Sequence, residues 1–406
     1  MPVIVDILTA RGQGAYYCED IAALHATSTP ERDRWTAPSV TPGFKQVREV
    51  AETLSVGLVL DDGSVAWGDC VGVSYGGKAG RDPVFRAEAG EAEVRQQLES
   101  WKGKQILRFR LAATELDGLA LSAAVRYGVS QALLFGLAGY ARKTPAEVLA
   151  EEWGYPLSPE PLPLQGSCGN DRLANVDKMI VNRLDVLPHG QVDDFDKQFG
   201  SNGEHLLAWA KQIVDRLAAL APPSYRPVLH FDVHGAAGRA FPAIADQVAF
   251  VKKLAAVCAG YTVRLESAVL QTTRDGQIAA LKSLRQALAE AHIRVALVAD
   301  EWATTVEDIE AFVKADAVDM VHVKMPNLGS LHHSVDAVQL CRRGGVDVLL
   351  GGSCIETDLS SRASVHVGLA TRPTALLIKP GMGINEGISL YRNEIARTHT
   401  LWRSKR

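Results

Sequence analysis

The sequence lacks any hydrophobic run long enough to cross a membrane. A membrane-spanning helix needs about 20 consecutive apolar residues, and no segment of this 406-residue chain approaches that length. The first residues, MPVIVDILTARG, have no basic stretch, and Asp6 interrupts their apolar run, so they do not match a signal peptide. We therefore expect a cytoplasmic protein with no membrane partner.

The sequence also has few cysteines and no concentration of positive charge. Its six cysteines are scattered without a CxxC pair, which favours a reducing compartment over a disulfide framework. The formal net charge is −4 and no basic stripe is present, which argues against a nucleic-acid partner. With 47% hydrophobic residues, the chain is an ordinary globular one, long enough for two domains or one large barrel with an addition.

Residues 1–160 differ in pattern from the rest of the chain. The stretch LSVGLVLDDGSVAWGDCVGV alternates around Asp62-Gly63, as β-hairpins do. Among the helical patterns that follow, LSAAVRYGVSQALLFGLAGYA is apolar on nearly all sides and should be buried against another domain. We therefore expect an α+β capping domain, joined to the remainder by the proline-rich segment EEWGYPLSPEPLPL.

From residue 161 to residue 406, short apolar runs alternate with helix-length segments. This alternation predicts a parallel sheet, and eight repeats predict closure into a TIM-like (β/α) barrel. An open doubly wound sheet is disfavoured because no glycine-rich dinucleotide fingerprint follows the first strand. The eight runs are PLPLQGS, LDVLPHG, RPVLHFDVHG, YTVRLESAV, RVALVADEW, VDMVHVKMP, VDVLLGGSC and TALLIKPG.

Three consecutive strands of this expected barrel end in acids. Asp232, Glu266 and Asp300 are separated by equal steps of 34 residues, so they should occupy equivalent positions on strands about 4.8 Å apart. A single carboxylate after a strand is more often a helix N-cap, but capping does not explain three at equal spacing. Active sites of such barrels lie at the carboxyl ends of the strands, and oxygen ligands there suit Mg²⁺. We expect one ion bound by the three acids.

Two candidate bases flank the acids. Lys324 ends the sixth strand and His189 the second, so in a ring of eight they would face a bound substrate from opposite sides. Proton abstraction beside a carboxylate is the chemistry that this arrangement suggests. The alternatives are a solvated strand end for Lys324 and a hydrogen-bonded structural histidine for His189.

This order of elements and residues is similar to the enolase superfamily, and within it the chain most resembles the methylaspartate ammonia-lyase family. The resemblance implies an enolase-like modified TIM barrel with an N-terminal α+β capping domain, assembled as a homodimer or a higher homo-oligomer. The motifs that carry it are NVDKMIVNRLDVLPHG, LHFDVHG, VADEW, VHVKMPNLGSLHHSVDAV, GGSCIETDLSSR and LIKPGMGINEG.

The resemblance also implies an activity. It points to an Mg²⁺-dependent carbon–nitrogen lyase that removes the C3 proton of a 3-methylaspartate-like amino diacid and eliminates ammonia, giving a mesaconate-type product. Lys324 would take the proton of one C3 epimer, with His189 placed for the other. A monovalent cation such as K⁺ would be compatible with the family. The alternative is another enolase-superfamily reaction, a racemisation or dehydration of a different carboxylate.

Substrate contacts follow from the same resemblance. Ser353 and the backbone of Cys354 would hold carboxylate oxygens, and Leu377 would pack beside the methyl group. The family, however, carries glutamine where Ser167 and His322 stand in this chain. Losing two glutamines removes amide donors that would bind the substrate.

Three further positions depart from the family pattern. Ser353 stands where the family has threonine, which keeps the hydroxyl group. Ser74 replaces a glutamine of the cap loop, and Gln165 replaces an aromatic residue of the first barrel strand. The catalytic residues thus match the family while the substrate-binding residues differ, so the substrate preference is expected to differ as well.

Two other motifs do not predict a site. The stretch GVSYGGKA, residues 72–79, satisfies GxxxxGK but ends in alanine where a P-loop needs a hydroxyl; we expect a flexible cap loop over the barrel mouth. His332 and His333 are adjacent, so on a helix they would point in different directions. We expect them to be surface polar residues rather than a metal-binding pair.

Overall fold

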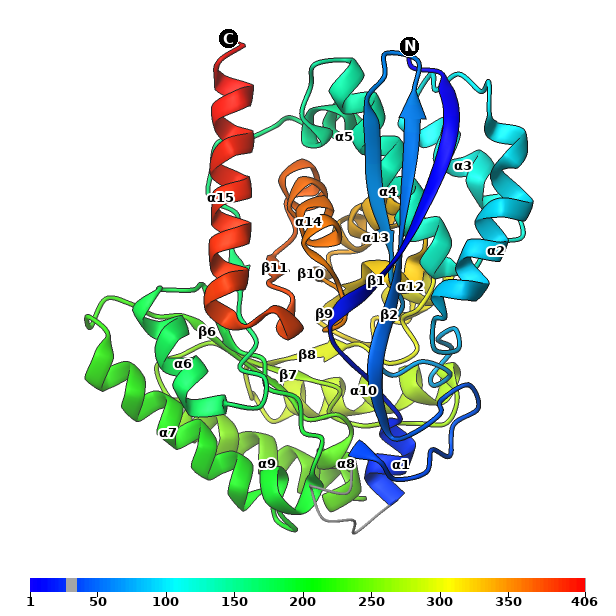
Figure 1. Ribbon diagram of the computed structural model, residues 1–406. Helices are drawn as coiled ribbons and strands as arrows, with labels where there is room; N and C mark the ends of the chain where they lie inside the picture. Colours follow the sequence, from blue (N-terminus) through cyan, green and yellow to red (C-terminus); the bar gives the residue numbers. More distant parts are fainter. Residues whose placement is uncertain (27–34, 406) are drawn as a thin grey trace.

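The computed structural model describes residues 1–26 and 35–405. Within these residues, a three-stranded antiparallel sheet accompanies a closed barrel of eight strands. Figure 1 shows the sheet standing along one side of the molecule and the C-terminal helix along the other. The predicted barrel with an N-terminal α+β cap is confirmed.

The N-terminal sheet consists of a hairpin and one long strand. β2 (Arg48–Leu60) and β3 (Val65–Cys70) pair in antiparallel fashion. The turn between them contains Gly63 with a φ of +84°, which glycine adopts at low cost, so the predicted hairpin is confirmed. β1 (Ile4–Glu19) lies antiparallel against the other edge of β2.

The barrel takes one strand from each of the eight predicted runs. Its strands are β4 (Leu164–Gln165), β5 (Val186–Pro188), β6 (Val228–Asp232), β7 (Val263–Glu266), β8 (Val295–Ala299), β9 (Met320–Lys324), β10 (Asp347–Gly351) and β11 (Ala375–Leu377). Neighbouring strands pair in parallel, in the closed order β10-β11-β4-β5-β6-β7-β8-β9. Asp232 pairs with Glu266 in this register, so the carboxyl ends of β6 and β7 lie level.

Helices surround both parts. They are α1 (Ile21–Ala26), α2 (Ala87–Leu98), α3 (Phe109–Asp117), α4 (Ala123–Tyr140), α5 (Pro145–Trp153), α6 (Arg172–Val181), α7 (Glu204–Leu220), α8 (Ala236–Ala240), α9 (Ile244–Val257), α10 (Arg274–Glu290), α11 (Val306–Lys314), α12 (Met325–Leu328), α13 (Leu331–Arg343), α14 (Asp358–Thr371) and α15 (Ile384–Arg403). Short 3-10 or π-helical turns occupy Glu99–Trp101, Phe195–Phe199 and Pro380–Met382. Among the described residues, no helix combines the length and the apolar character that crossing a membrane would require.

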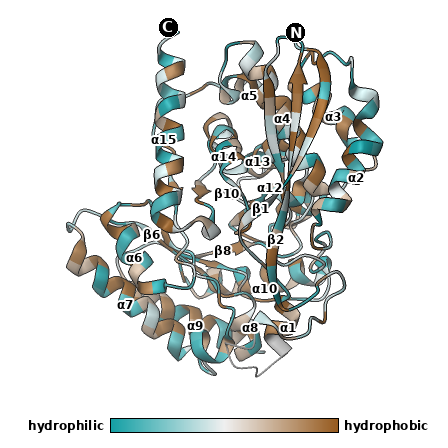
Figure 2. Cartoon of the chain, in the orientation of Figure 1, coloured by the Kyte–Doolittle hydropathy of each residue, from teal (hydrophilic) through white to brown (hydrophobic). Residues whose placement is uncertain are grey.

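The barrel helices are amphipathic, as their sequence pattern predicts. On α7, Leu206, Trp209, Ile213 and Leu217 are buried at intervals of three or four residues, which places them on one face of the helix. Figure 2 shows hydrophobic and hydrophilic residues alternating along α7 and α15. The apolar faces cover the barrel and the polar faces meet solvent.

Helix α4 lies between the N-terminal sheet and the barrel. It packs on β2 and β3, and it also contacts α12, α13 and α14 of the barrel. Its residues are buried on nearly every side, as the all-round apolar sequence predicts. A Cβ on Gly128 would lie 2.7 Å from the carbonyl carbon of Asp69 and closer still to the Cys70 nitrogen, so glycine is needed where α4 crosses β3.

The chain passes from the cap to the barrel between α5 and β4. Helix α5 ends at Trp153 and β4 begins at Leu164, and the intervening residues 154–163 include four prolines. The expected domain boundary at residue 160 falls within this segment and stays a prediction.

The interior of the barrel is filled by side chains from β5 and from β8 to β11. They form one cluster of buried residues, and its member Leu377 also lines a cavity at the carboxyl ends of the strands. The barrel is therefore a packed core rather than a pore. The cluster consists of Val186, Val298, Met320, Leu349, Ala375 and Leu377.

We predict that Gly128→Ala destabilises the protein while Gly139→Ala, on the same helix, does not. The first methyl group meets backbone atoms of β3, whereas nothing lies within 4 Å of the second. Overpacking should cost about 3 kcal/mol at Gly128, while better helix propensity at Gly139 should contribute up to about 1 kcal/mol. Thermal unfolding followed by circular dichroism measures both effects. Equal midpoints for the two variants would contradict this account of α4 packing.

Candidate active site

A cavity of about 120 Å³ lies at the carboxyl ends of the barrel strands. Glu266, Asp300 and Gln165 are not among its lining residues, although all three are buried. The predicted site residues that line it are Ser74, Ser167, His189, Asp232, His322, Lys324, Ser353, Cys354 and Leu377.

The three predicted metal ligands lie at the ends of adjacent strands. Asp232 is the last residue of β6, Glu266 is the last residue of β7, and Asp300 directly follows β8. All three side chains are at most 5% exposed. The structure therefore has a row of buried carboxylates at the barrel mouth, at the positions that the equal spacing predicts.

Glu266 is surrounded by imidazole rings. Its Oε2 lies 2.5 Å from His230 Nε2 and 3.4 Å from His189 Nε2, and its Oε1 lies 2.8 Å from His322 Nδ1. Burial alone would raise the pKa of Glu266, but the nearby His322 and His189 hold it well below its usual range. Glu266 is therefore ionised in this arrangement.

The negative charge of Asp232 is compensated far less than that of Glu266. Burial, followed by the charge of the neighbouring Glu266, raises the pKa of Asp232 to about 8. Its Oδ1 accepts a hydrogen bond from the backbone nitrogen of His234 at 3.1 Å. A positive charge placed beside Asp232 would remove this penalty.

Asp300 has one occupied oxygen and one orphaned oxygen. Its Oδ2 accepts hydrogen bonds from Lys324 Nζ at 2.6 Å and from Arg81 Nη2 at 3.5 Å. Its buried Oδ1 has no hydrogen-bond partner among the described residues. An orphaned buried carboxylate oxygen, next to the unbalanced charge of Asp232, fits a site for a hard cation.

The ligand atoms that lie closest together are not the three acids. One nitrogen each of His189 and His322 and one oxygen of Glu266 lie within 4.8 Å of one another. His230, which shares Oε2 of Glu266 with His189, is held neutral because burial lowers its pKa to about 4. Carboxylate and imidazole ligands therefore surround the same point of the site.

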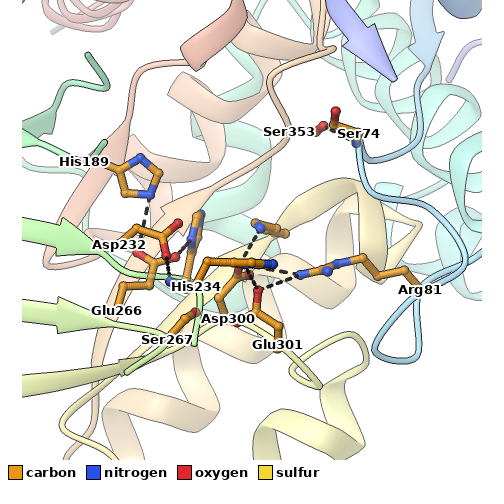
Figure 3. A network of polar contacts seen from close by, with 12 residues as sticks. Ser74, Arg81, His189, Asp232, His234, Glu266, Ser267, Asp300, Glu301 and Ser353 are labelled. Carbon is orange, nitrogen blue, oxygen red and sulfur yellow. Dashed lines mark hydrogen bonds and ion pairs between the residues drawn. The ribbon is translucent and has the colours of Figure 1, made fainter. Parts of the chain in front are cut away.

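A second network of polar contacts joins the cap loop to the row of buried carboxylates. Arg81 Nη2 lies 3.8 Å from Glu301 Oε1 as well as next to Asp300, and its side chain is only 2% exposed. Glu301 Oε1 also lies 3.0 Å from His234 Nδ1, and Ser267 donates a hydrogen bond to the other oxygen. Figure 3 shows Arg81 reaching from the cap loop toward Asp300 and Glu301. Glu301 therefore orients the row through Arg81 and is not a first-turn acid of the next helix, because α11 begins only at residue 306.

The two candidate bases come from β5 and β9, the strands on either side of the three that carry the acids. Lys324, the last residue of β9, contacts Asp300, while His189, directly after β5, approaches Glu266. Burial would lower the pKa of His189, but Glu266 and Asp232 raise it overall. Ser167 Oγ donates a hydrogen bond to the backbone oxygen of His189 at 2.8 Å, which holds the loop that carries the imidazole.

The loop after β10 is fixed by contacts with the cap. Ser353 Oγ accepts a hydrogen bond from the backbone nitrogen of Ser74 at 3.0 Å, and the Ser353 nitrogen donates to Glu356 Oε2 at 2.8 Å. Glu356 is completely buried and pairs with Lys379 at 2.7 Å, while Tyr127 of α4 donates to its second oxygen at 2.7 Å. These contacts position Ser353 at the cavity wall.

Gln165 is the predicted substrate contact that the structure supports least. It is fully buried in β4, it does not line the cavity, and neither side-chain polar atom has a hydrogen-bond partner among the described residues. Its role in substrate binding stays a prediction.

Sequence reasoning missed several residues of the site. His230 could have been found, because it lies two positions before Asp232 and side chains two apart share a face of a strand. Arg81 gave no signal beyond its place in the expected cap loop. Besides Arg81, the polar side chains that line the cavity and that sequence reasoning missed are Tyr16, Glu19, Tyr75, Asn170, Arg172, Gln191, Asp193 and Gln198.

Comparisons with known proteins agree along the whole chain. The family models "Methylaspartate ammonia-lyase N-terminus" and "Methylaspartate ammonia-lyase C-terminus" match residues 3–154 and 156–404. Methylaspartate ammonia-lyase 1 of Carboxydothermus hydrogenoformans is 40% identical, over 97% of this chain and 96% of the relative.

Two solved structures share both sequence and fold. The Citrobacter amalonaticus enzyme containing (2S,3S)-3-methylaspartic acid has a TM-score of 0.94 at 37% identity, covering 99% of this chain and 100% of its own. The β-methylaspartase of Clostridium tetanomorphum, solved as a magnesium complex, has a TM-score of 0.91 at 35% identity and full coverage of both chains. The chain therefore belongs to the methylaspartate ammonia-lyase family, which is a family of carbon–nitrogen lyases.

Proposed function

We propose that this protein eliminates ammonia from a 3-methylaspartate-like amino diacid, with Asp232, Glu266 and Asp300 holding one Mg²⁺. The observation that carries the proposal is the row of three buried carboxylates with a candidate base on the strand at either side. Lys324 lies beside Asp300, and His189 lies beside Glu266, the middle acid. The substrate in the Citrobacter relative and the magnesium in the Clostridium relative support both parts.

The cation and the protein side chains would have different roles in the reaction. A bound Mg²⁺ would supply positive charge next to the substrate carboxylate and so stabilise charge that develops there. The orphaned Oδ1 of Asp300 and the poorly compensated Asp232 are the protein groups that need this charge most. Arg81 would keep Asp300 in place, because its guanidinium contacts both Asp300 and the adjacent Glu301.

The bases would act on C3 of the substrate. Lys324 Nζ donates to Asp300 in the present arrangement. With a cation held by Asp300, the unprotonated amine of Lys324 would be the group available to face the substrate. The base then takes the C3 proton, and the electrons of the C3–H bond form the C2=C3 double bond. The C2–N bond breaks and its electron pair leaves with the nitrogen, which is released as ammonia.

The substrate-binding residues differ from those of the family in a defined way. Ser167 uses its hydroxyl on the backbone of His189, so it has no donor left for a substrate. His322 directs Nδ1 to Glu266, and its buried Nε2 has no partner among the described residues. One imidazole nitrogen would thus replace two amide groups, which favours a substrate other than plain 3-methylaspartate.

The racemase or dehydratase alternative has one supporting observation. Bases on the two strands that flank the carboxylate row would also permit removal of a proton from one face and its return to the other. Incubation in heavy water separates the two functions, because racemisation incorporates deuterium without release of ammonia.

Three further properties complete the proposal. The six cysteines are all unpaired and five of them are buried, which suits work in the reducing cytoplasm. Assembly as a homodimer or higher homo-oligomer and use of a monovalent cation such as K⁺ rest on the family resemblance.

We expect purified protein with Mg²⁺ to convert threo-3-methylaspartate or a close analogue to ammonia and a conjugated diacid, detected by ultraviolet absorbance. Chelation should abolish this activity reversibly. Asp232→Asn should lower kcat/KM by about a thousandfold or more, while leaving thermal stability unchanged or higher, since it removes a buried charge beside Glu266. Asp275→Asn, at an exposed acid, is the control. Full activity without metal would contradict the proposal.

We also expect the two bases to serve different C3 epimers. Lys324→Ala should abolish deuterium exchange at C3 of one epimer and spare the other, and His189→Ala should do the reverse, because a base must come within about 3 Å of the proton it removes. Nuclear magnetic resonance in heavy water follows each epimer separately. Parallel loss of both epimers in both variants would show that one residue only positions the substrate.

Replacing His322 and Ser167 by the glutamines of the family should increase the preference of this protein for 3-methylaspartate. His322→Gln and Ser167→Gln should each raise kcat/KM for 3-methylaspartate about tenfold, the value of one or two recovered hydrogen bonds. Ser353→Thr keeps the hydroxyl group and should change it little. If the unaltered protein already matches its relatives on this substrate, the argument about His322 and Ser167 is wrong.

A further inference from the structure

A second cluster of metal-ligating side chains lies where the cap meets the barrel. Asp117 is the last residue of α3 in the cap, and His332 and His333 lie in the first turn of α13 in the barrel. None of the three lines the active-site cavity. The proposed lyase activity makes no use of them.

The two histidines converge, contrary to the sequence prediction. His332 Nε2 lies 3.1 Å and His333 Nε2 lies 2.8 Å from the same atom, Asp117 Oδ2. The ring centroids are 4.0 Å apart with an interplanar angle of 35°. The expectation of diverging side chains was wrong because both rings turn toward the carboxylate that faces the start of α13.

The distances suit a tetrahedral ion after a small adjustment. One ligand atom from each residue lies within 4.8 Å of the other two. Metal–ligand bonds of 2.0–2.2 Å in a tetrahedron place neighbouring ligand atoms about 3.4 Å apart. The two Asp117–histidine distances, 3.1 and 2.8 Å, would therefore lengthen by about 0.3 and 0.6 Å.

The surroundings hold the carboxylate and leave an entry path. Ser330 Oγ donates a hydrogen bond to Asp117 Oδ1 at 2.7 Å, which leaves Oδ2 for the ion and orients the group as supporting residues do in metal sites. His332 is buried, whereas the side chains of His333 and Asp117 are 34% and 23% exposed. Water can therefore reach the cluster and supply a fourth ligand.

We propose that Asp117, His332 and His333 bind a divalent transition-metal ion of the zinc type that joins the cap to the barrel. Two imidazoles and one carboxylate suit Zn²⁺ or Co²⁺, whereas Mg²⁺ prefers oxygen ligands. The site is thereby chemically distinct from the oxygen-rich row of the active site. Because α3 belongs to the cap and α13 to the barrel, an ion here links the two parts at a point remote from the chemistry.

One feature limits the affinity. His332 Nδ1 is buried and has no hydrogen-bond partner among the described residues. Ligation through Nε2 puts the ring proton on this nitrogen, and an unsatisfied buried donor weakens binding by roughly 10- to 100-fold. The site should therefore exchange its ion with chelators rather than retain it permanently.

The test is a titration of the whole protein with Zn²⁺ and Co²⁺ in the His322→Gln background, which removes one imidazole from the His189–Glu266–His322 cluster. Equilibrium dialysis counts bound zinc, and Co²⁺ reports tetrahedral coordination by its visible spectrum. The protein should bind one equivalent of zinc more than the same protein with Asp117→Asn, and its thermal midpoint should rise about 3 °C further when the ion is about 100-fold above its Kd.

Variants assign the site. Adding His333→Asn or Asp117→Asn should weaken binding at least about tenfold and remove the thermal shift. His292→Asn is the matched control, because His292 is exposed with a φ of +55° that asparagine tolerates. Zinc uptake that is absent, or that is equal in His333→Asn and the control, would show a hydrogen-bonded contact only and overturn the proposal. Since zinc occupancy is measured without turnover, failure of the lyase proposal would not affect this outcome.

Discussion

The burial of three carboxylates at adjacent strand ends is the constraint that organises this molecule. Each must be balanced by positive charge or by hydrogen-bond donors, because an uncompensated buried charge is strongly destabilising. Glu266 is balanced by imidazoles and Asp300 by Lys324 and Arg81. Asp232 has the least compensating positive charge, and this imbalance makes the row suitable for a cation.

The balancing groups come from both parts of the chain. Arg81 reaches the row from the cap loop, Ser74 contacts Ser353 through its backbone, and Tyr127 of α4 supports the buried Glu356 beneath the same loop. The barrel supplies the acids and the bases, and the cap fixes their surroundings. Complementary charge and packing at this junction make one site from two parts.

Periodic features of the sequence predicted most of the fold and the row of acids. Three features could be predicted because each depends on residue types that are adjacent or regularly spaced in the sequence. They are the turn at Asp62-Gly63, the eight apolar runs and the equal spacing of the acids. Contacts between distant segments have no such signature: nothing in the sequence shows that His322 turns to Glu266 or that His333 turns to Asp117. Their side-chain directions depend on what the tertiary structure brings opposite them.

The position of α4 has a consequence for how such a protein could be divided or recombined. One face of this helix completes the cap sheet, and the other covers apolar surface of α12, α13 and α14. A barrel made alone would expose that surface to solvent, and a transplanted cap would have to bring a helix that fits it, including glycine at position 128. The two parts therefore fit as a matched pair, so specificity is easier to alter by single replacements around the cavity than by exchange of whole modules.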